Sequence, residues 1–116
     1  MEELDTSSAL ADCLARSNGQ PLFIFKHSTR CPISSGAHSE VEAYLREAGD
    51  ASIPVYINYV VESRAVSNEI AQLLGIRHES PQLMLVFGGA AVWNVSHGSI
   101  RASEMVRVAA SQKDTE

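Results

Sequence analysis

Short apolar runs alternate along this chain with segments of helical periodicity. Residues 22–27 carry few polar side chains, which is typical of a central strand covered on both faces. Residues 53–61 are rich in β-branched and aromatic side chains and predict a second strand. Residues 83–87 predict a third strand, and residues 91–95 predict a fourth after the turn signal Gly88-Gly89.

Four amphipathic segments, with apolar residues spaced by three and four positions, surround these runs and predict helices. Pro32 fits the first turn of the second helix, where its missing N–H costs nothing. The expected start signals are Thr6, Pro32, Ser63 and Gly98-Ser99, and the expected stop signals are Asn18-Gly19, Gly49 and Gly75.

The order of elements is helix, strand–helix–strand, helix, hairpin, helix. A strand–helix–strand unit crosses over right-handed, so its two strands are parallel, whereas the hairpin adds two antiparallel strands. The expected fold class is therefore α/β, with a central mixed four-stranded sheet and helices on both faces. The chain has 116 residues, which predicts a single domain over residues 1–116.

Composition and charge exclude several classes of protein. The 9 basic and 14 acidic residues give a net charge of −5, which argues against a nucleic-acid partner. No apolar run approaches the ~20 residues of a membrane-spanning helix, and the acidic start of the chain does not resemble a secretory signal. Two cysteines are too few for a disulfide framework, so we expect a cytoplasmic, reducing location and no membrane partner.

The candidate chemistry lies in Thr29–Ser34, at the junction of the first long strand and the next helix. A helix start stabilises anions, so Cys31 is expected to react as a thiolate, with Lys26 and Arg30 adding positive charge nearby. Three residues later, where a dithiol motif carries its second cysteine, the chain has Ser34, which could donate a hydrogen bond to the Cys31 sulfur. A mixed disulfide at Cys31 would then await an external thiol.

Three blocks spread over the chain carry a resemblance to a known family: Lys26–Ser34, His78–Gln82, and Ser96-His97 with Ile100. Together they resemble the monothiol bacilliredoxins of the YtxJ type, within the thioredoxin-like superfamily. Thioredoxin-like proteins place a redox cysteine where Cys31 stands. They also place a cis-proline before the third core strand, where Ser80-Pro81 stands.

This resemblance implies a monothiol thiol–disulfide oxidoreductase. Its clients would be proteins in mixed disulfide with bacillithiol, a small cysteine-containing thiol, which acts as co-substrate without any tightly bound cofactor. Cys31 would take the small thiol from the client, and a second thiol or a partner disulfide reductase would release it. The implied catalytic residues are Cys31, Pro32 and Ser34, and the implied substrate-binding residues are Thr29, Arg30, Ser80 and Pro81.

Two alternatives stay open beside this interpretation. The chain could hold an iron–sulfur cluster through Cys31 and an external thiol, as some monothiol glutaredoxins do, although Pro32 offers no glycine for close approach. Cys13 could act as a remote resolving cysteine, although its place on an apolar helical stripe favours buried packing. Phe25 stands where thioredoxins carry a buried acid, and that acid is what a dithiol cycle would need.

The four histidines match no zinc-binding spacing, so no metal site is expected. His78 and His97 are expected near the rim of the active site. There they could bind carboxylates of a small thiol.

Overall fold

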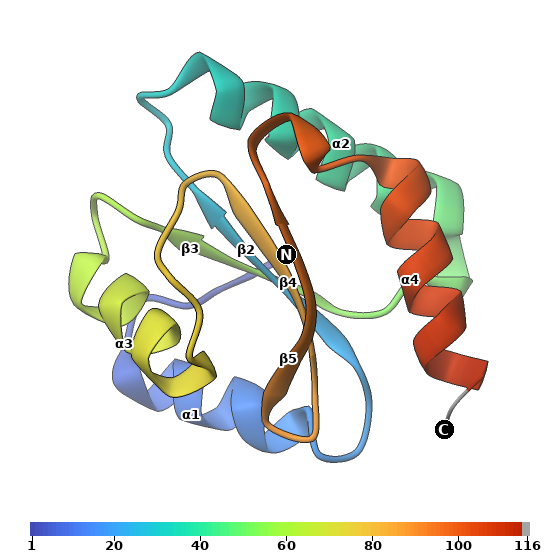
Figure 1. Ribbon diagram of the computed structural model, residues 1–116, viewed down its shortest axis with the longest axis horizontal. Helices are drawn as coiled ribbons and strands as arrows, with labels where there is room; N and C mark the ends of the chain where they lie inside the picture. The colour runs from blue at the N-terminus through green and yellow to red at the C-terminus, as the bar shows by residue number, and fades with distance from the viewer. Residues whose placement is uncertain (115–116) are drawn as a thin grey trace.

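The computed structural model describes residues 1–114, and a five-stranded sheet in the order β1-β3-β2-β4-β5 forms its centre (Figure 1). The strands are β1 (Glu2–Glu3), β2 (Leu22–His27), β3 (Val55–Tyr59), β4 (Gln82–Phe87) and β5 (Ala90–Ser96). β1, β3 and β2 are parallel to one another, whereas β4 is antiparallel to both β2 and β5. The sheet is therefore mixed, as predicted.

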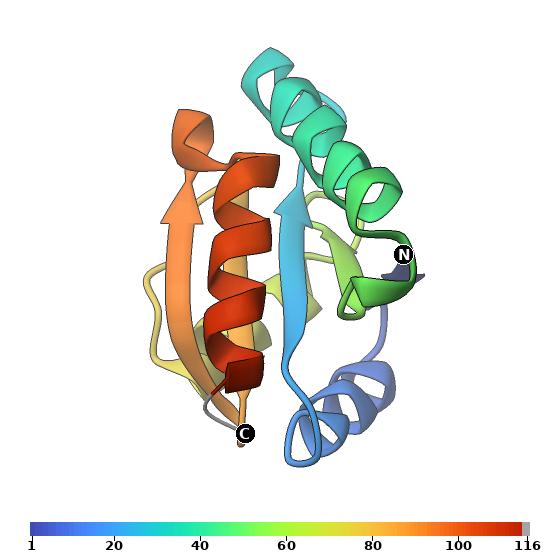
Figure 2. The same ribbon diagram turned by 90° about the vertical axis from the view of Figure 1, so that its right-hand side faces the viewer.

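Helices cover both faces of this sheet. They are α1 (Ser7–Arg16), α2 (Pro32–Ala48), α3 (Arg64–Leu74) and α4 (Ala102–Asp114), with short 3-10 turns η1 (Gly49–Ala51) and η2 (His97–Ser99). α2 and α4 lie on one face, and α1 and α3 lie on the other, as Figures 1 and 2 show. None of these helices, within the described part of the chain, is long and apolar enough to cross a membrane.

The predicted number of strands was wrong by one. β1 adds a fifth strand by pairing in parallel with β3, and the Leu4 N–H extends the contact by donating to the Ile57 carbonyl at 2.7 Å. The sequence does not signal β1 because both of its residues are exposed glutamates, so no apolar alternation marks it. β3 is also shorter than the predicted 53–61, since it spans only Val55–Tyr59.

Several predicted boundaries are confirmed. The Thr6 hydroxyl caps α1 by accepting a hydrogen bond from the Ala9 N–H at 3.0 Å, and Pro32 is the first residue of α2. Gly75 ends α3 with a φ of 64°, in the left-handed region that glycine adopts without strain. The Ser80-Pro81 peptide bond is cis.

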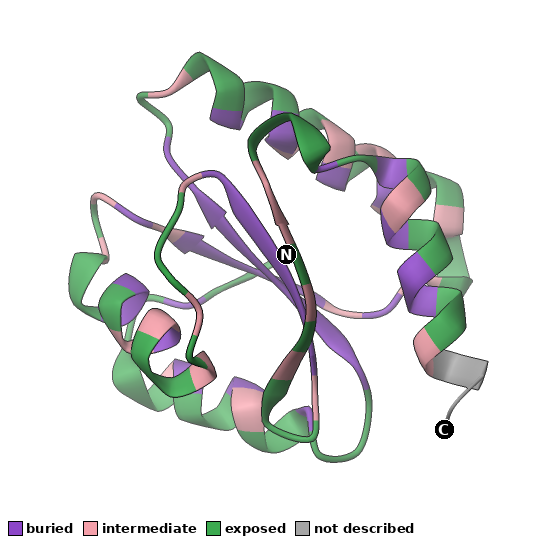
Figure 3. Cartoon of the chain, in the orientation of Figure 1, coloured by how far each residue is buried: buried purple, intermediate pink, exposed green. Residues whose placement is uncertain are grey.

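Two apolar cores form because side chains alternate along each strand. Figure 3 shows the central strands as buried while β5 is partly exposed. The core under α2 and α4 includes Phe23, Phe25, Val41, Tyr44, Leu83 and Met105. The core under α1 and α3 includes Leu4, Leu10, Cys13, Ile24, Ile70 and Met84.

Tyr44 tests how far the packing of α2 depends on one buried hydrogen bond. Its hydroxyl accepts a hydrogen bond from the Ile53 N–H at 2.9 Å, and its ring packs edge-on against Phe23 at 5.5 Å. Tyr44→Phe leaves that N–H unpaired in the core. We expect the free energy of unfolding, measured by urea denaturation, to fall by about 1–3 kcal/mol.

Tyr56→Phe is the matched control. The Tyr56 hydroxyl accepts from Arg16 Nη1 at 2.7 Å, and the Arg16 side chain stays in contact with water when that partner is lost. The control should lose less stability than Tyr44→Phe. Equal losses would contradict the importance of the Tyr44 hydroxyl.

Candidate active site

Cys31 lies immediately before α2, at the end of the short loop that leaves β2. It is the N-cap residue of the helix, with extended backbone angles (φ −113°, ψ 121°), and its side chain makes no capping hydrogen bond. The thiol is free and the residue is half-buried. Cys31 is therefore a reachable sulfur at a helix start, where the backbone N–H groups favour a negative charge.

Ser34 is completely buried in the first turn of α2, and it binds the end of β2. Its Oγ lies 2.8 Å from His27 Nδ1 and accepts a hydrogen bond from the Ser28 N–H at 2.9 Å. Among the described residues these are its hydrogen-bond partners, and the Cys31 sulfur suggested by the sequence is not one of them. Ser34 therefore joins both ends of the loop that carries Cys31.

The cis-proline lies beside the end of β2. In the antiparallel register of β2 with β4, Lys26 is opposite Gln82, so the start of β4 meets the end of β2. Pro81 directly precedes Gln82 and is buried, and its carbonyl accepts a hydrogen bond from the His97 N–H at 3.0 Å. The residues predicted for the site gather at this end of the sheet: Thr29, Arg30, Cys31, Pro32, Ser34, Ser80 and Pro81.

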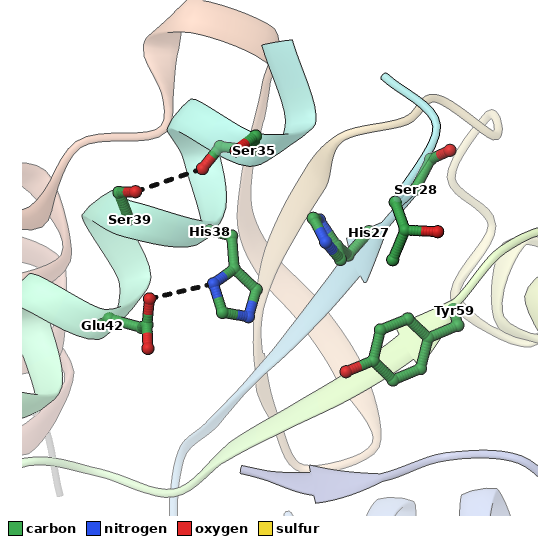
Figure 4. A pocket seen from close by; sticks show the side chains of 8 residues that line it. His27, Ser28, Ser35, His38, Ser39, Glu42 and Tyr59 are labelled. Carbon is green, nitrogen blue, oxygen red and sulfur yellow. Dashed lines mark hydrogen bonds and ion pairs between the residues drawn. The ribbon is translucent and has the colours of Figure 1, made fainter. Parts of the chain in front are cut away.

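Cavities lie along two sides of α2 near its start. The first, of about 420 Å³, includes in its lining His27, Thr29, Ser35, His38, Glu42 and Tyr59 (Figure 4). The second, of about 220 Å³, includes Ile33, Glu40, His97, Gly98 and Arg101. At 100° per residue, the helix positions that face the first cavity are on roughly the opposite side of α2 from those that face the second.

Cys13 is 1% exposed, under α1 on the face of the sheet opposite α2. Burial raises the pKa of its thiol to about 12, so it is protonated at neutral pH. The end of α1 contacts the β4–β5 turn, where the Gly88 N–H donates to the Ser17 carbonyl at 2.7 Å. That turn lies at the far end of β4 from Pro81. The predicted packing role of Cys13 is confirmed.

Lys26, predicted from the sequence to add positive charge near Cys31, is a buried residue of β2. The residue is 0% exposed and points toward α3, across the sheet from α2. Its Nζ is 3.0 Å from His78 Nδ1, so His78 contacts this buried amine. Burial lowers the pKa of Lys26 to about 8. Burial and the charge of Lys26 also lower the pKa of His78.

Lys26 is the centre of a buried polar row that sequence reasoning missed. Asn58 on β3 and Gln82 on β4 are its register partners, and both are buried. Their amide nitrogens donate to the carbonyls of Leu4 and Arg77, at 3.0 and 3.1 Å. Their amide oxygens are buried without a hydrogen-bond partner among the described residues. The signal for this row was three polar residues within apolar strands.

Comparison with known proteins identifies the family. A model of the monothiol bacilliredoxin BrxC family matches residues 2–105. The chain belongs to this family. It is similar to a solved structure described as an oxidoreductase with a thioredoxin fold, at 29% identity over 91% of this chain and 90% of that chain, with a TM-score of 0.81.

More distant thioredoxins share the fold of this bacilliredoxin family member. The thioredoxin of Fasciola hepatica is 13% identical over 97% of this chain and 99% of that chain, with a TM-score of 0.75. Chloroplastic thioredoxin z is 16% identical over 98% and 95% of the two chains, with a TM-score of 0.73. The protein is a thiol oxidoreductase with a thioredoxin fold.

The buried amine of Lys26 predicts a specific dependence of stability on pH. Its pKa falls from the usual 10.5 to about 8 on folding, so between these values the unfolded chain binds the proton more tightly. The contribution of Lys26 to stability is therefore unfavourable below pH 8 and improves as the pH rises toward 10.5. Lys26→Met removes this contribution while keeping most of the volume.

Urea denaturation at pH 7 and pH 10 measures this effect. The change in the free energy of unfolding caused by Lys26→Met should be more stabilising at pH 7 than at pH 10, by about 2 kcal/mol. Titrations of groups that do not interact with Lys26 cancel in this difference. A difference that is independent of pH would show that the Lys26 amine titrates normally.

Proposed function

We propose that this protein removes bacillithiol, or a related low-molecular-weight thiol, from protein mixed disulfides through Cys31. The observation that carries the proposal is that one cysteine is reachable whereas the other is enclosed in the core. Cys31 is half-exposed at a helix start, whereas Cys13 is buried with its pKa raised to about 12. Membership of the monothiol bacilliredoxin family supports bacillithiol as the small thiol.

The exchange needs two steps, and neither requires an outside oxidant. In the first, the Cys31 thiolate attacks the sulfur of the small thiol in the client's mixed disulfide, and the client leaves as a thiolate. In the second, another small-thiol thiolate attacks the disulfide at Cys31, which frees Cys31 and forms the small-thiol disulfide. A partner disulfide reductase could perform the second step by supplying the two electrons.

In this proposal some residues around Cys31 hold its backbone in place, and others bind the substrate. Pro32 begins the first turn of α2 and Ser34 ties that turn to the end of β2, which together hold Cys31 at the positive end of the helix. Thr29 and Arg30 form an exposed turn directly before Cys31. The Ser80 backbone, next to the buried Pro81, can pair with an extended client segment. No tightly bound cofactor is needed, because thiols supply the electrons.

The electrons for this cycle come from a pool of free small thiol. Such a pool is maintained in the reducing cytoplasm, where we place the protein. The clients are S-thiolated proteins.

Mass spectrometry of the protein after exposure to a bacillithiolated client tests the proposal. The adduct should appear on Cys31 while the client thiol is freed, and Cys31→Ser should abolish this transfer. Cys13→Ala is the matched control and should retain it, because Cys13 packs in the core and does not contact the site.

Three results would contradict the proposal. An adduct on Cys13, or a Cys13–Cys31 disulfide, would favour a dithiol cycle. A visible absorbance band in anaerobically purified protein, lost in Cys31→Ser, would favour the iron–sulfur alternative.

A further inference from the structure

The cavity shown in Figure 4 lies between α2 and the ends of β2 and β3. Ser35, His38, Ser39 and Glu42 recur at helical spacing and form one polar stripe of α2 along it. His27 enters from β2 and Tyr59 from β3, and the figure shows both rings to the right of this stripe. β1 pairs with β3 only at Tyr56 and Ile57, so Tyr59 lies beyond the part of β3 that β1 covers.

His27 directs a hydrogen-bond donor into this cavity. The Ser34 hydroxyl is buried and already accepts a hydrogen bond from the Ser28 N–H, so its own proton is satisfied by donating to His27 Nδ1. His27 then carries its proton on Nε2. Burial lowers the pKa of His27, which favours the neutral ring.

His38 can supply a hydrogen-bond acceptor beside the donor of His27. The two rings lie 4.8 Å apart between centroids, and His38 Nδ1 donates to Glu42 Oε1 at 3.1 Å. The Nε2 atom of His38 has no partner among the described residues, so it is available as an acceptor when the ring is neutral. Tyr59, Thr29 and the serines add hydroxyl groups, each of which both donates and accepts.

This lining matches one kind of ligand chemistry. Among the described residues that line the cavity there is no lysine or arginine, and Glu42 would repel a carboxylate. Mixed donors and acceptors instead suit a group that itself both donates and accepts. Hydroxyl groups on a sugar ring have this property, and the face of an aromatic ring such as Tyr59 packs against such rings.

The cavity is within reach of a group attached to Cys31. Ser28 and Thr29 are the third and second residues before Cys31. The Ser35 N–H donates to the Cys31 carbonyl at 3.2 Å, so Ser35 is one helical turn, about 5.4 Å, further along the same side of α2. The cavity at His97 lies on the other side of α2, near Pro81, where it leaves space for the client.

We propose that the cavity at His27, His38 and Tyr59 binds the hydroxyl-bearing part of the small thiol while that thiol is joined to Cys31. This inference rests on the proposed exchange at Cys31 and adds to it the site that selects the thiol. Bacillithiol carries hydroxyls on a sugar ring, whereas glutathione carries none. The cavity would therefore favour the first over the second.

Rates of disulfide exchange test the selection. We would measure the second-order rate constant of reduced protein with bacillithiol disulfide, glutathione disulfide and 5,5′-dithiobis(2-nitrobenzoate). Tyr59→Phe removes one hydroxyl, and His38→Phe keeps a ring against His27 and Phe25 while removing both nitrogens. Each should slow the reaction with bacillithiol disulfide about three- to tenfold, the effect of one lost hydrogen bond, and leave the other two rates unchanged.

Tyr56→Phe makes the same chemical change on the same strand, but its hydroxyl binds Arg16 on α1 and is outside the cavity. It should leave all three rates unchanged. Unchanged rates in Tyr59→Phe and His38→Phe would overturn the inference. An equal loss with all three disulfides would also overturn it, because the substitutions would then be acting on Cys31 itself.

Failure of the proposed function gives a different result. In that case the unsubstituted protein would not release bacillithiol from a client protein, whatever the variants do with the small disulfides. If the variants still react more slowly with bacillithiol disulfide alone, that result would identify the cavity as a binding site.

Discussion

The complete burial of β2 between two neighbouring strands is the constraint on which the rest of the structure depends. Its six residues are all buried, with β3 parallel on one side and β4 antiparallel on the other. The parallel neighbour requires a crossover, which α2 provides, and the antiparallel neighbour brings its own start to the end of β2. One strand therefore determines where both Cys31 and Pro81 lie.

The same burial explains why two small polar contacts matter at this end of the sheet. His27 is the last residue of β2, and its ring is held by Ser34 from the first turn of α2. Lys26, one position earlier, faces the opposite core and contacts His78, in the segment that leads to the cis-proline. Consecutive residues of one strand thus connect to the start of α2 and to the segment before the cis-proline, one on each face of the sheet.

Most of the fold could be predicted because local signals agreed with one another. Pro32, Gly75 and the run 22–27 each mark an element by a physical property of the chain, and the family resemblance added the cis bond at Pro81. β1 could not be predicted, since two exposed glutamates gain their strand conformation only from the edge of β3. The direction of Lys26 could have been inferred from alternation along β2, but its partner His78 is 52 residues away in sequence. The role of Ser34 likewise depends on how α2 docks onto β2, which its neighbours in sequence do not specify.

The burial of Cys13 has a practical consequence for work with this protein. Under native conditions a thiol-specific reagent meets a single reachable sulfur, because the other is enclosed under α1. Labelling stoichiometry then counts free Cys31 directly, and the unreacted fraction is the share of molecules that carry an adduct there. The same titration repeated in denaturant counts both cysteines, so each preparation supplies its own internal standard for occupancy.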